Sequence, residues 1–205
     1  DDHALLSTPC MSYKTSQGVT TVVVGNCGIS LAPLRFFGDR PPAPLDLLGD
    51  GYNFPRMADF VDHLEANPPA TNAAYLCGHT TLRVGAMDDL MRPATADEIS
   101  LMKDNLSEAL DSGALGLSTG LAYDPAKSAP TREVLSLAEI LGPADALYTT
   151  HLRDEGANII TSLEEAFQIG RESDAAVVLS HHKVTGKENI GRSEETLELI
   201  DRVRK

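Results

Sequence analysis

Short runs of β-branched and other apolar residues alternate with helix-like segments, and this alternation constrains the fold of the chain more than any other feature. Five runs predict strands, one within 18–28 and the others at 72–77, 114–118, 146–150 and 175–180. Apolar residues recur at helical spacing at 56–67, 95–113, 131–141, 158–172 and 193–204. Such alternation is typical of a parallel sheet built from βαβ units. We therefore expect an α/β fold in a single domain.

The first run ends in the most distinctive stretch of the sequence. Its apolar residues are consecutive, which favours a parallel strand covered on both faces. Gly25 and Gly28 flank Cys27 and allow tight backbone geometry around the thiol. A free cysteine in this position is also compatible with a small buried hydrophobe.

Residues that can bind ligands follow each of the five predicted strands. They are Cys27, His79, Ser118, His151 and His181. The carboxyl ends of parallel strands lie at one edge of a sheet, where binding and catalytic groups collect. We therefore expect these side chains to share one end of the sheet.

His151 and His181 are separated by one βα repeat, so their imidazoles are expected within reach of a single ion. Together with Cys27 they form a donor set of one sulfur and two imidazoles, which suits zinc. Polar residues also occur at strand ends without any ligand, so chance placement is the alternative. His182 is predicted to point to the other side of its strand.

Two segments are predicted to be irregular. The stretch 32–52 is rich in proline and glycine, which favours either an ordered loop over the strand ends or a plain connection. After Tyr123, Pro125 is expected to keep the chain out of a helix.

Composition excludes several classes of function. The formal net charge of −13, without clustered Lys or Arg, argues against a nucleic-acid partner. No apolar run is long enough to cross a membrane. The three cysteines have no disulfide-like spacing, which favours a reducing compartment and a cytoplasmic location. The dinucleotide motif Gly-x-Gly-x-x-Gly opens no predicted helix, so an oxidoreductase is not favoured.

Several motifs together resemble those of one enzyme family. They are Gly-Asn-Cys-Gly at 25–28, Ala-Pro-Leu-Asp-Leu-Leu at 43–48, Gly-His-Thr-Thr-Leu-Arg at 78–83, Thr-His-Leu-Arg-Asp-Glu-Gly at 150–156 and Ser-His-His-Lys-Val at 180–184. The chain resembles the D-aminoacylase family, the N-acyl-D-amino-acid deacylases of the amidohydrolase superfamily. The resemblance covers essentially the whole chain.

The resemblance implies a partial (β/α)8 TIM barrel of the metal-dependent hydrolase type, with about strands 2–6 of 8. It implies zinc held by Cys27, His151 and His181, and a substrate carboxylate bound by Lys183 and Tyr123. The implied reaction is hydrolysis of the amide of an N-acyl-D-amino acid, a small-molecule substrate, to a carboxylate and the free D-amino acid. The sequence makes no prediction of the oligomeric state.

Two elements of the family pattern are not found in the sequence. The family carries a His-x-His pair on its first barrel strand and a catalytic aspartate near its last strand. We therefore expect 1–205 to be a single catalytic-barrel fragment that lacks both elements, with the catalytic residue outside it.

Two other functions remain open. A cyclic amidase of the dihydroorotase or hydantoinase type would use a similar barrel with a modified lysine as bridging ligand, but Cys27 rather than a lysine stands at that strand end. A non-catalytic metal-binding part of a barrel is the other reading.

We expect the 205-residue chain alone to have little or no deacylase activity, because the group that would pass a proton from water to the leaving amine lies outside it. An assay of the purified chain with N-acetyl-D-methionine tests this. Turnover at an ordinary enzyme rate would contradict it.

Overall fold

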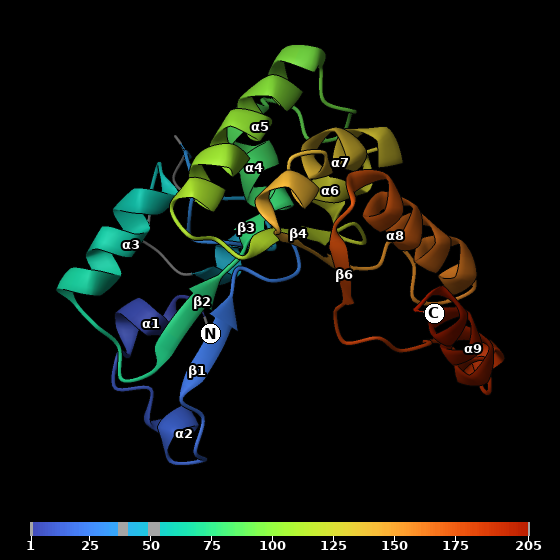
Figure 1. Cartoon of the computed structure of the whole chain (residues 1–205), viewed down its shortest axis with the longest axis horizontal. Coiled ribbons are helices and arrows are strands. Elements are labelled where there is room, and N and C mark those ends of the chain that lie inside the picture. The colour runs from blue at the N-terminus through green and yellow to red at the C-terminus, as the bar shows by residue number, and fades with distance from the viewer. Residues whose placement is uncertain (1, 37–40, 49–53, 205) are drawn as a thin grey trace.

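The computed structural model describes residues 2–36, 41–48 and 54–204. Within these residues the strands pair only in parallel, and most helices lie on one side of them (Figure 1). The strands are β1 (Thr21–Val24), β2 (Asn72–Tyr75), β3 (Cys77–Gly78), β4 (Gly116–Gly120), β5 (Leu147–His151) and β6 (Ala176–Leu179). The helices are α1 (Ala4–Ser7), α2 (Ser12–Thr15), α3 (Met57–Ala66), α4 (His79–Ala86), α5 (Ala96–Asp111), α6 (Asp124–Lys127), α7 (Thr131–Ala138), α8 (Ile159–Ser173) and α9 (Ser193–Val203).

Strand order follows chain order. β1 pairs with β2, and β3, β4, β5 and β6 form a second sheet in that sequence. Gly120 of β4 lies opposite His151 of β5, and Thr150 lies opposite Leu179 of β6, so the carboxyl ends of these strands are adjacent. The expected parallel α/β class is confirmed. In the described ranges the strands form no closed ring, and closure into a barrel stays a prediction.

Two details of the predicted strands are wrong. The run 72–77 is divided at Leu76 into β2 and β3, which belong to different sheets. In β1, Val22 and Val24 are buried but Val23 is 56% exposed, so only one face of this strand is covered. A consecutive β-branched run reflects strand preference as well as burial, which explains the error. β4 and the two-residue β3 are buried at every residue.

The longer helices agree with the sequence expectations to within a few residues. The capping box of α5 is present, with reciprocal hydrogen bonds between Thr95 and Glu98. Four helices were not predicted, namely α1, α2, α4 and α6. α4 begins directly at His79, which was predicted only to follow a strand. α6 contains Pro125 in its first turn, where proline's missing N–H needs no partner, so the expectation that Pro125 excludes a helix is wrong.

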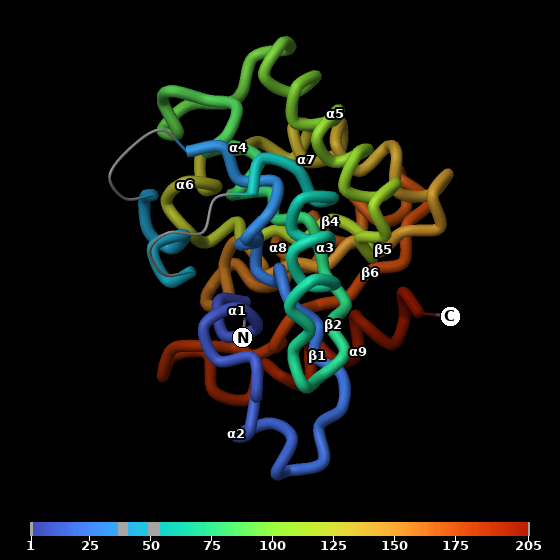
Figure 2. The backbone as a smooth tube through the Cα atoms, turned by 90° about the vertical axis from the view of Figure 1, so that its left-hand side faces the viewer, coloured from blue at the N-terminus to red at the C-terminus, as the bar shows by residue number. Residues whose placement is uncertain are grey.

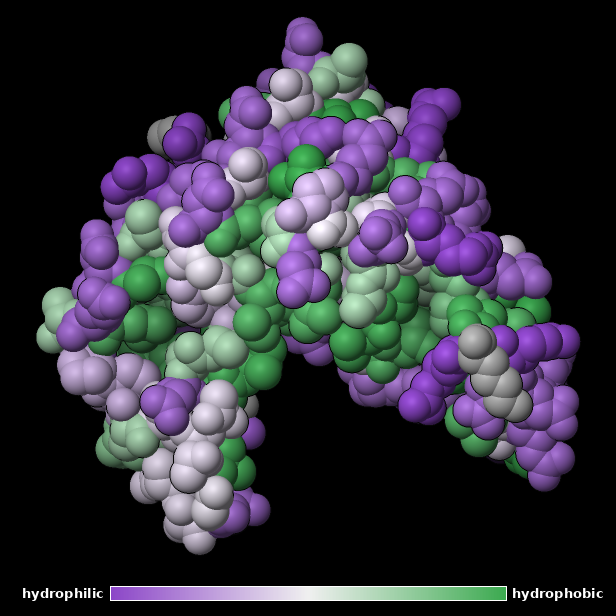
Figure 3. Space-filling model, in the orientation of Figure 1, coloured by the Kyte–Doolittle hydropathy of each residue, from purple (hydrophilic) through white to green (hydrophobic). Residues whose placement is uncertain are grey.

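The molecule has the outline of an arch. α1, α2, β1 and β2 form one arm, and α8 and α9 form the other (Figure 1; Figure 2 shows the first arm from its side). Figure 3 shows apolar side chains gathered on the underside of the arch, between the arms. None of the helices described is long and apolar enough to cross a membrane.

The proline-rich stretch 32–52 lies partly outside the described residues, at 37–40 and 49–53. The described part includes a 3-10 turn, Leu45–Leu48. Leu45 and Leu48 are buried in the main core, so this part of the stretch packs against the domain.

A buried ion pair joins two outer helices. Arg83 of α4 and Glu133 of α7 are paired with side chains that are 0% and 1% exposed. Arg83 also donates to the carbonyl of Pro125, at 2.7 Å. Glu133 accepts from the backbone N–H of Ala94 at 2.9 Å and lies 3.2 Å from Nε2 of His79. Burial opposes the ionisation of Glu133, but these hydrogen bonds and charges outweigh it and lower its pKa to about 2.

We expect Glu133→Gln to destabilise the chain by about 3 kcal/mol, because it leaves the Arg83 guanidinium buried without a counter-charge. Because the pKa of Glu133 lies below its ordinary value of 4.5, its contribution is complete above that pH and is lost as the pH falls towards 2. Urea denaturation at several pH values measures this. Glu139→Gln is the matched control, since its exposed pair with Lys103 is worth about 0.5 kcal/mol or less. Equal losses in the two variants would contradict the prediction.

Candidate metal centre

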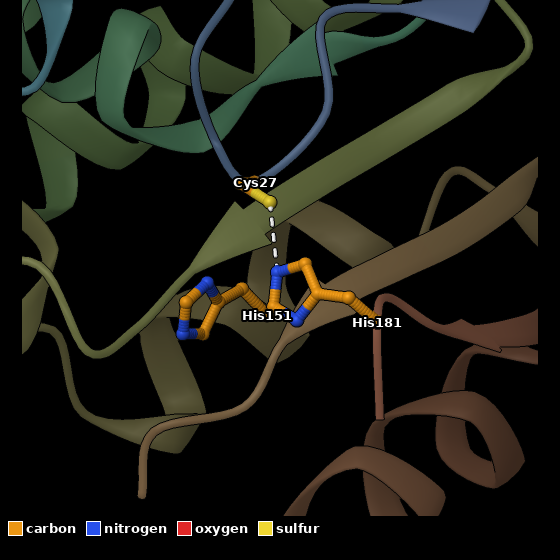
Figure 4. A group of neighbouring side chains, drawn as sticks. All are labelled: Cys27, His151 and His181. Carbon is orange, nitrogen blue, oxygen red and sulfur yellow. Dashed lines mark hydrogen bonds between the residues drawn. The ribbon is translucent and has the colours of Figure 1, made fainter. Parts of the chain in front are cut away.

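Cys27, His151 and His181 come together at the carboxyl ends of the strands. Cys27 lies on the loop after β1, His151 is the last residue of β5, and His181 follows β6. One potential ligand atom from each residue lies within 4.8 Å of the others. Figure 4 shows the thiol of Cys27 directed at the imidazole of His181, with a separation of 3.4 Å between Sγ and Nε2. The structure thus places the predicted set in one cluster, and its role as a metal site stays a prediction.

The loop 25–28 turns sharply to present Cys27. Gly25 and Gly28 have φ of 80° and 79°, and Cys27 itself has φ of 55°. Ser118 of β4 holds both sides of this turn, because its hydroxyl accepts from the N–H of Gly28 at 3.0 Å and donates to the carbonyl of Gly25. Ser118 was predicted at the end of a strand with the other ligand-type residues. It lies inside β4, and its hydroxyl binds the backbone of the loop 25–28.

Asn26 fastens the same loop to the other strands. Its Oδ1 accepts from the hydroxyl of Thr149 in β5 at 3.2 Å and from that of Ser180 after β6 at 3.1 Å. The loop after β1 is therefore tied to the strands that supply both histidines. This role of Asn26 was not predicted from the sequence, where its signal is an amide side chain directly beside Cys27.

Gly120 at the end of β4 has no side chain, which allows the loop 25–28 to lie close against this strand. A Cβ at this position would lie 2.1 Å from the carbonyl oxygen of Cys27, a distance that real atoms do not adopt. Any larger residue would push the Cys27 backbone away from the strand.

His151 lies between Tyr123 and Glu155. Its Nδ1 is 3.2 Å from the hydroxyl of Tyr123, and its Nε2 is 3.5 Å from Oε2 of Glu155. Its ring meets that of His181 edge to face, with centroids 4.4 Å apart. Burial lowers the pKa of His151, and His181 and Lys183 add to this effect although Glu155 opposes it. The neutral imidazole that a metal requires is therefore favoured.

Glu155 contacts most of the cluster and was not identified from the sequence. Its Oε1 is 3.3 Å from Nδ1 of His181, and its Oε2 pairs with the ammonium of Lys183. Burial and the charge of Glu155 raise the pKa of the Cys27 thiol, while Lys183 acts in the opposite direction. A bound cation reverses this balance, because a coordinating thiol loses its proton. One thiol and two imidazoles fit zinc by donor chemistry.

Two other histidines at strand ends lie outside the cluster. His79 was expected at the same end of the sheet, but it is fully buried in α4 and bonded to Glu133. That expectation is wrong because a helix begins at this residue and turns its side chain into the outer layer. His182 lies 3.0 Å from the hydroxyl of Thr196 in α9, away from the cluster as predicted.

Lys183 and Tyr123, the predicted substrate-binding residues, both border the cluster. The ammonium of Lys183 is 3.1 Å from Nδ1 of His181, and its side chain is 48% exposed. The ring of Tyr123 meets that of His151 edge to face at 5.0 Å. Both residues can therefore be reached by a molecule that contacts the cluster.

Comparison with known proteins gives a consistent result. A D-aminoacylase from Alcaligenes xylosoxydans xylosoxydans is 55% identical over 203 residues, which cover 98% of this chain and 42% of that protein. A crystal structure of D-aminoacylase matches with a TM-score of 0.96 and 54% identity, over 100% of this chain and 43% of that one. No family model matches the chain.

A second solved structure carries a bound metal. N-acyl-D-glutamate deacylase from Bordetella bronchiseptica, solved with zinc and a phosphonate mimic of the tetrahedral intermediate, matches with a TM-score of 0.95 and 43% identity, over 100% of this chain and 43% of that one. The chain thus spans less than half the length of the relatives it matches. The motif resemblance is confirmed along the whole sequence, and the chain is a homologue of the D-aminoacylases that matches them over less than half of their length.

Proposed function

We propose that the full-length protein is a zinc-dependent N-acyl-D-amino-acid deacylase, which hydrolyses the amide to a carboxylate and a free D-amino acid. The observation that carries this proposal is the convergence of Cys27, His151 and His181 within 4.8 Å at the strand ends. The similarity to D-aminoacylase and to a zinc-containing N-acyl-D-glutamate deacylase supports the reaction class.

Cys27, His151 and His181 would hold the zinc. When bound, zinc supplies a Lewis acid that polarises a carbonyl and makes water more acidic. The protein's own contribution is to hold the donors in place. The loop 25–28 holds the thiol, and β5 and β6 hold the two imidazoles.

Lys183 and Tyr123 would bind the carboxylate of the substrate. An ammonium and a phenol both donate to carboxylate oxygens. Burial raises the pKa of Tyr123, and the charges of Cys27 and Glu155 add to this, so the phenol keeps its proton. The catalytic aspartate, which would act as acid and base, would lie outside residues 1–205.

We expect the full-length protein to bind zinc at the cluster and to lose both zinc and activity on Cys27→Ala, because the thiolate is the only sulfur donor of the set. Elemental analysis after dialysis against metal-free buffer measures the zinc, and release of free D-amino acid measures activity. Cys10→Ala is the control, since Cys10 is an exposed cysteine. Stoichiometric zinc and normal activity in Cys27→Ala would exclude this site.

We expect Lys183→Met to raise KM for an N-acyl-D-amino acid by about tenfold or more, because the proposed charge-assisted hydrogen bond to the carboxylate of the substrate is lost. Lys187→Met removes an exposed lysine four positions further along the chain and serves as the control. Steady-state kinetics on the zinc-loaded full-length protein measure the change. An unaltered KM in Lys183→Met would show that the lysine does not bind the substrate.

A further inference from the structure

Glu155 is the residue that contacts both candidate histidine ligands at once. Its Oε2 lies 3.5 Å from Nε2 of His151, and its Oε1 lies 3.3 Å from Nδ1 of His181. The side chain is 11% exposed, and Oε1 is buried without a hydrogen bond. A buried carboxylate oxygen needs a donor, and an N–H on Nδ1 of His181, which lies beside Oε1, can supply one.

The two histidines turn different nitrogens towards Glu155. His181 directs Nε2 at the sulfur of Cys27 and Nδ1 at Glu155. His151 directs Nε2 at Glu155, which leaves Nδ1 on the side of Tyr123. A neutral imidazole carries its proton on one nitrogen and offers the lone pair of the other. Whichever nitrogen donates to the carboxylate therefore determines which one can bind a metal.

We propose that Glu155 is a positioning residue that accepts the N–H of both histidines, Nε2–H of His151 and Nδ1–H of His181. It thereby presents Nδ1 of His151 and Nε2 of His181 to the ion. This inference rests on the proposed metal site. Carboxylates that receive the distal N–H of a ligating histidine fix its tautomer and its ring orientation. Here one carboxylate does so for two ligands from neighbouring strands.

The proposed tautomer of His181 also determines which group pairs with the ammonium of Lys183. Its ammonium is 3.1 Å from Nδ1 of His181, a contact that requires this nitrogen to accept a hydrogen bond. A proton on Nδ1 excludes that hydrogen bond. In the proposed tautomer Lys183 therefore pairs with Glu155, whose Oε2 it already contacts. The lysine is then held by the carboxylate that orients the two histidines.

The tautomers can be observed directly in the unaltered protein. We expect long-range ¹H–¹⁵N spectra of the zinc-loaded, full-length protein, labelled with ¹⁵N-histidine, to show a proton on Nε2 of His151 and on Nδ1 of His181. His151→Asn and His181→Asn assign the two signals. A proton on Nδ1 of His151 or on Nε2 of His181 would overturn the proposal. This measurement does not depend on the folding of a Glu155 variant.

Substitution of Glu155 tests the energetic role. We expect Glu155→Gln to weaken zinc binding by about 10- to 100-fold, the usual loss when a partner of a ligating histidine is removed. Glu155→Asp keeps the charge and is expected to restore part of the affinity. Glu164→Gln makes the same charge change at an exposed site on α8 and is expected to leave the affinity within twofold. Competition with a chromogenic chelator measures each affinity, and circular dichroism verifies folding.

The controls separate this inference from the proposed function. If Cys27→Ala removes zinc and Glu155→Gln leaves its affinity unchanged, the metal site stands and the role of Glu155 is wrong. If Cys27→Ala leaves zinc in place, the metal site itself is wrong and the inference fails with it.

Discussion

The hydrogen bonds that hold the loop 25–28 against β4, β5 and the end of β6 are the interaction on which the candidate site depends. Cys27 has a left-handed backbone conformation, which costs a non-glycine residue of order 1–3 kcal/mol. Bonds from Ser118, and from Thr149 and Ser180 to Asn26, each contribute about 1 kcal/mol and offset that cost. His181 is also left-handed, with φ of 40°. The side chains of these two residues meet at 3.4 Å, so two of the three candidate ligands are presented from left-handed positions, a conformation that Met11, Asp145 and Asp174 also adopt elsewhere in the chain.

Glu133 and Glu155 have similar partners but lie in different surroundings. Glu133 and Glu155 each contact a histidine and a basic side chain. Glu133 and its partners are closed off from solvent, and hydrogen bonds occupy both of its oxygens. Glu155 has an oxygen without a hydrogen bond and faces a histidine that is 42% exposed. The contacts of Glu133 link two helices and have a structural role. Glu155, in contrast, borders a surface that ligands can reach.

The sequence predicted the elements that depend on local pattern. Parallel strands with polar residues at their carboxyl ends placed Cys27, His151 and His181 in one cluster, because adjacent parallel strands end at the same edge. The same rule failed for His79, since a helix starts there without the usual loop. Asn26 and Glu155 could not be found in this way. The partners of Asn26 and one of the two histidine partners of Glu155 are distant in the chain, and a single amide or carboxylate gives no periodic signal.

The cluster also joins distant parts of the arch. Cys27 and His181 are 154 positions apart, and they belong to the ends of the first and last strands described. A cation bound between them would connect these strands directly. A ligand that binds only the folded chain stabilises it by RT ln(1 + [L]/Kd), about 2.7 kcal/mol at one hundred times Kd. That gain is of the same order as the cost of the left-handed conformations at Cys27 and His181. A cation bound at the cluster would therefore offset the cost of the left-handed conformations that present its donors.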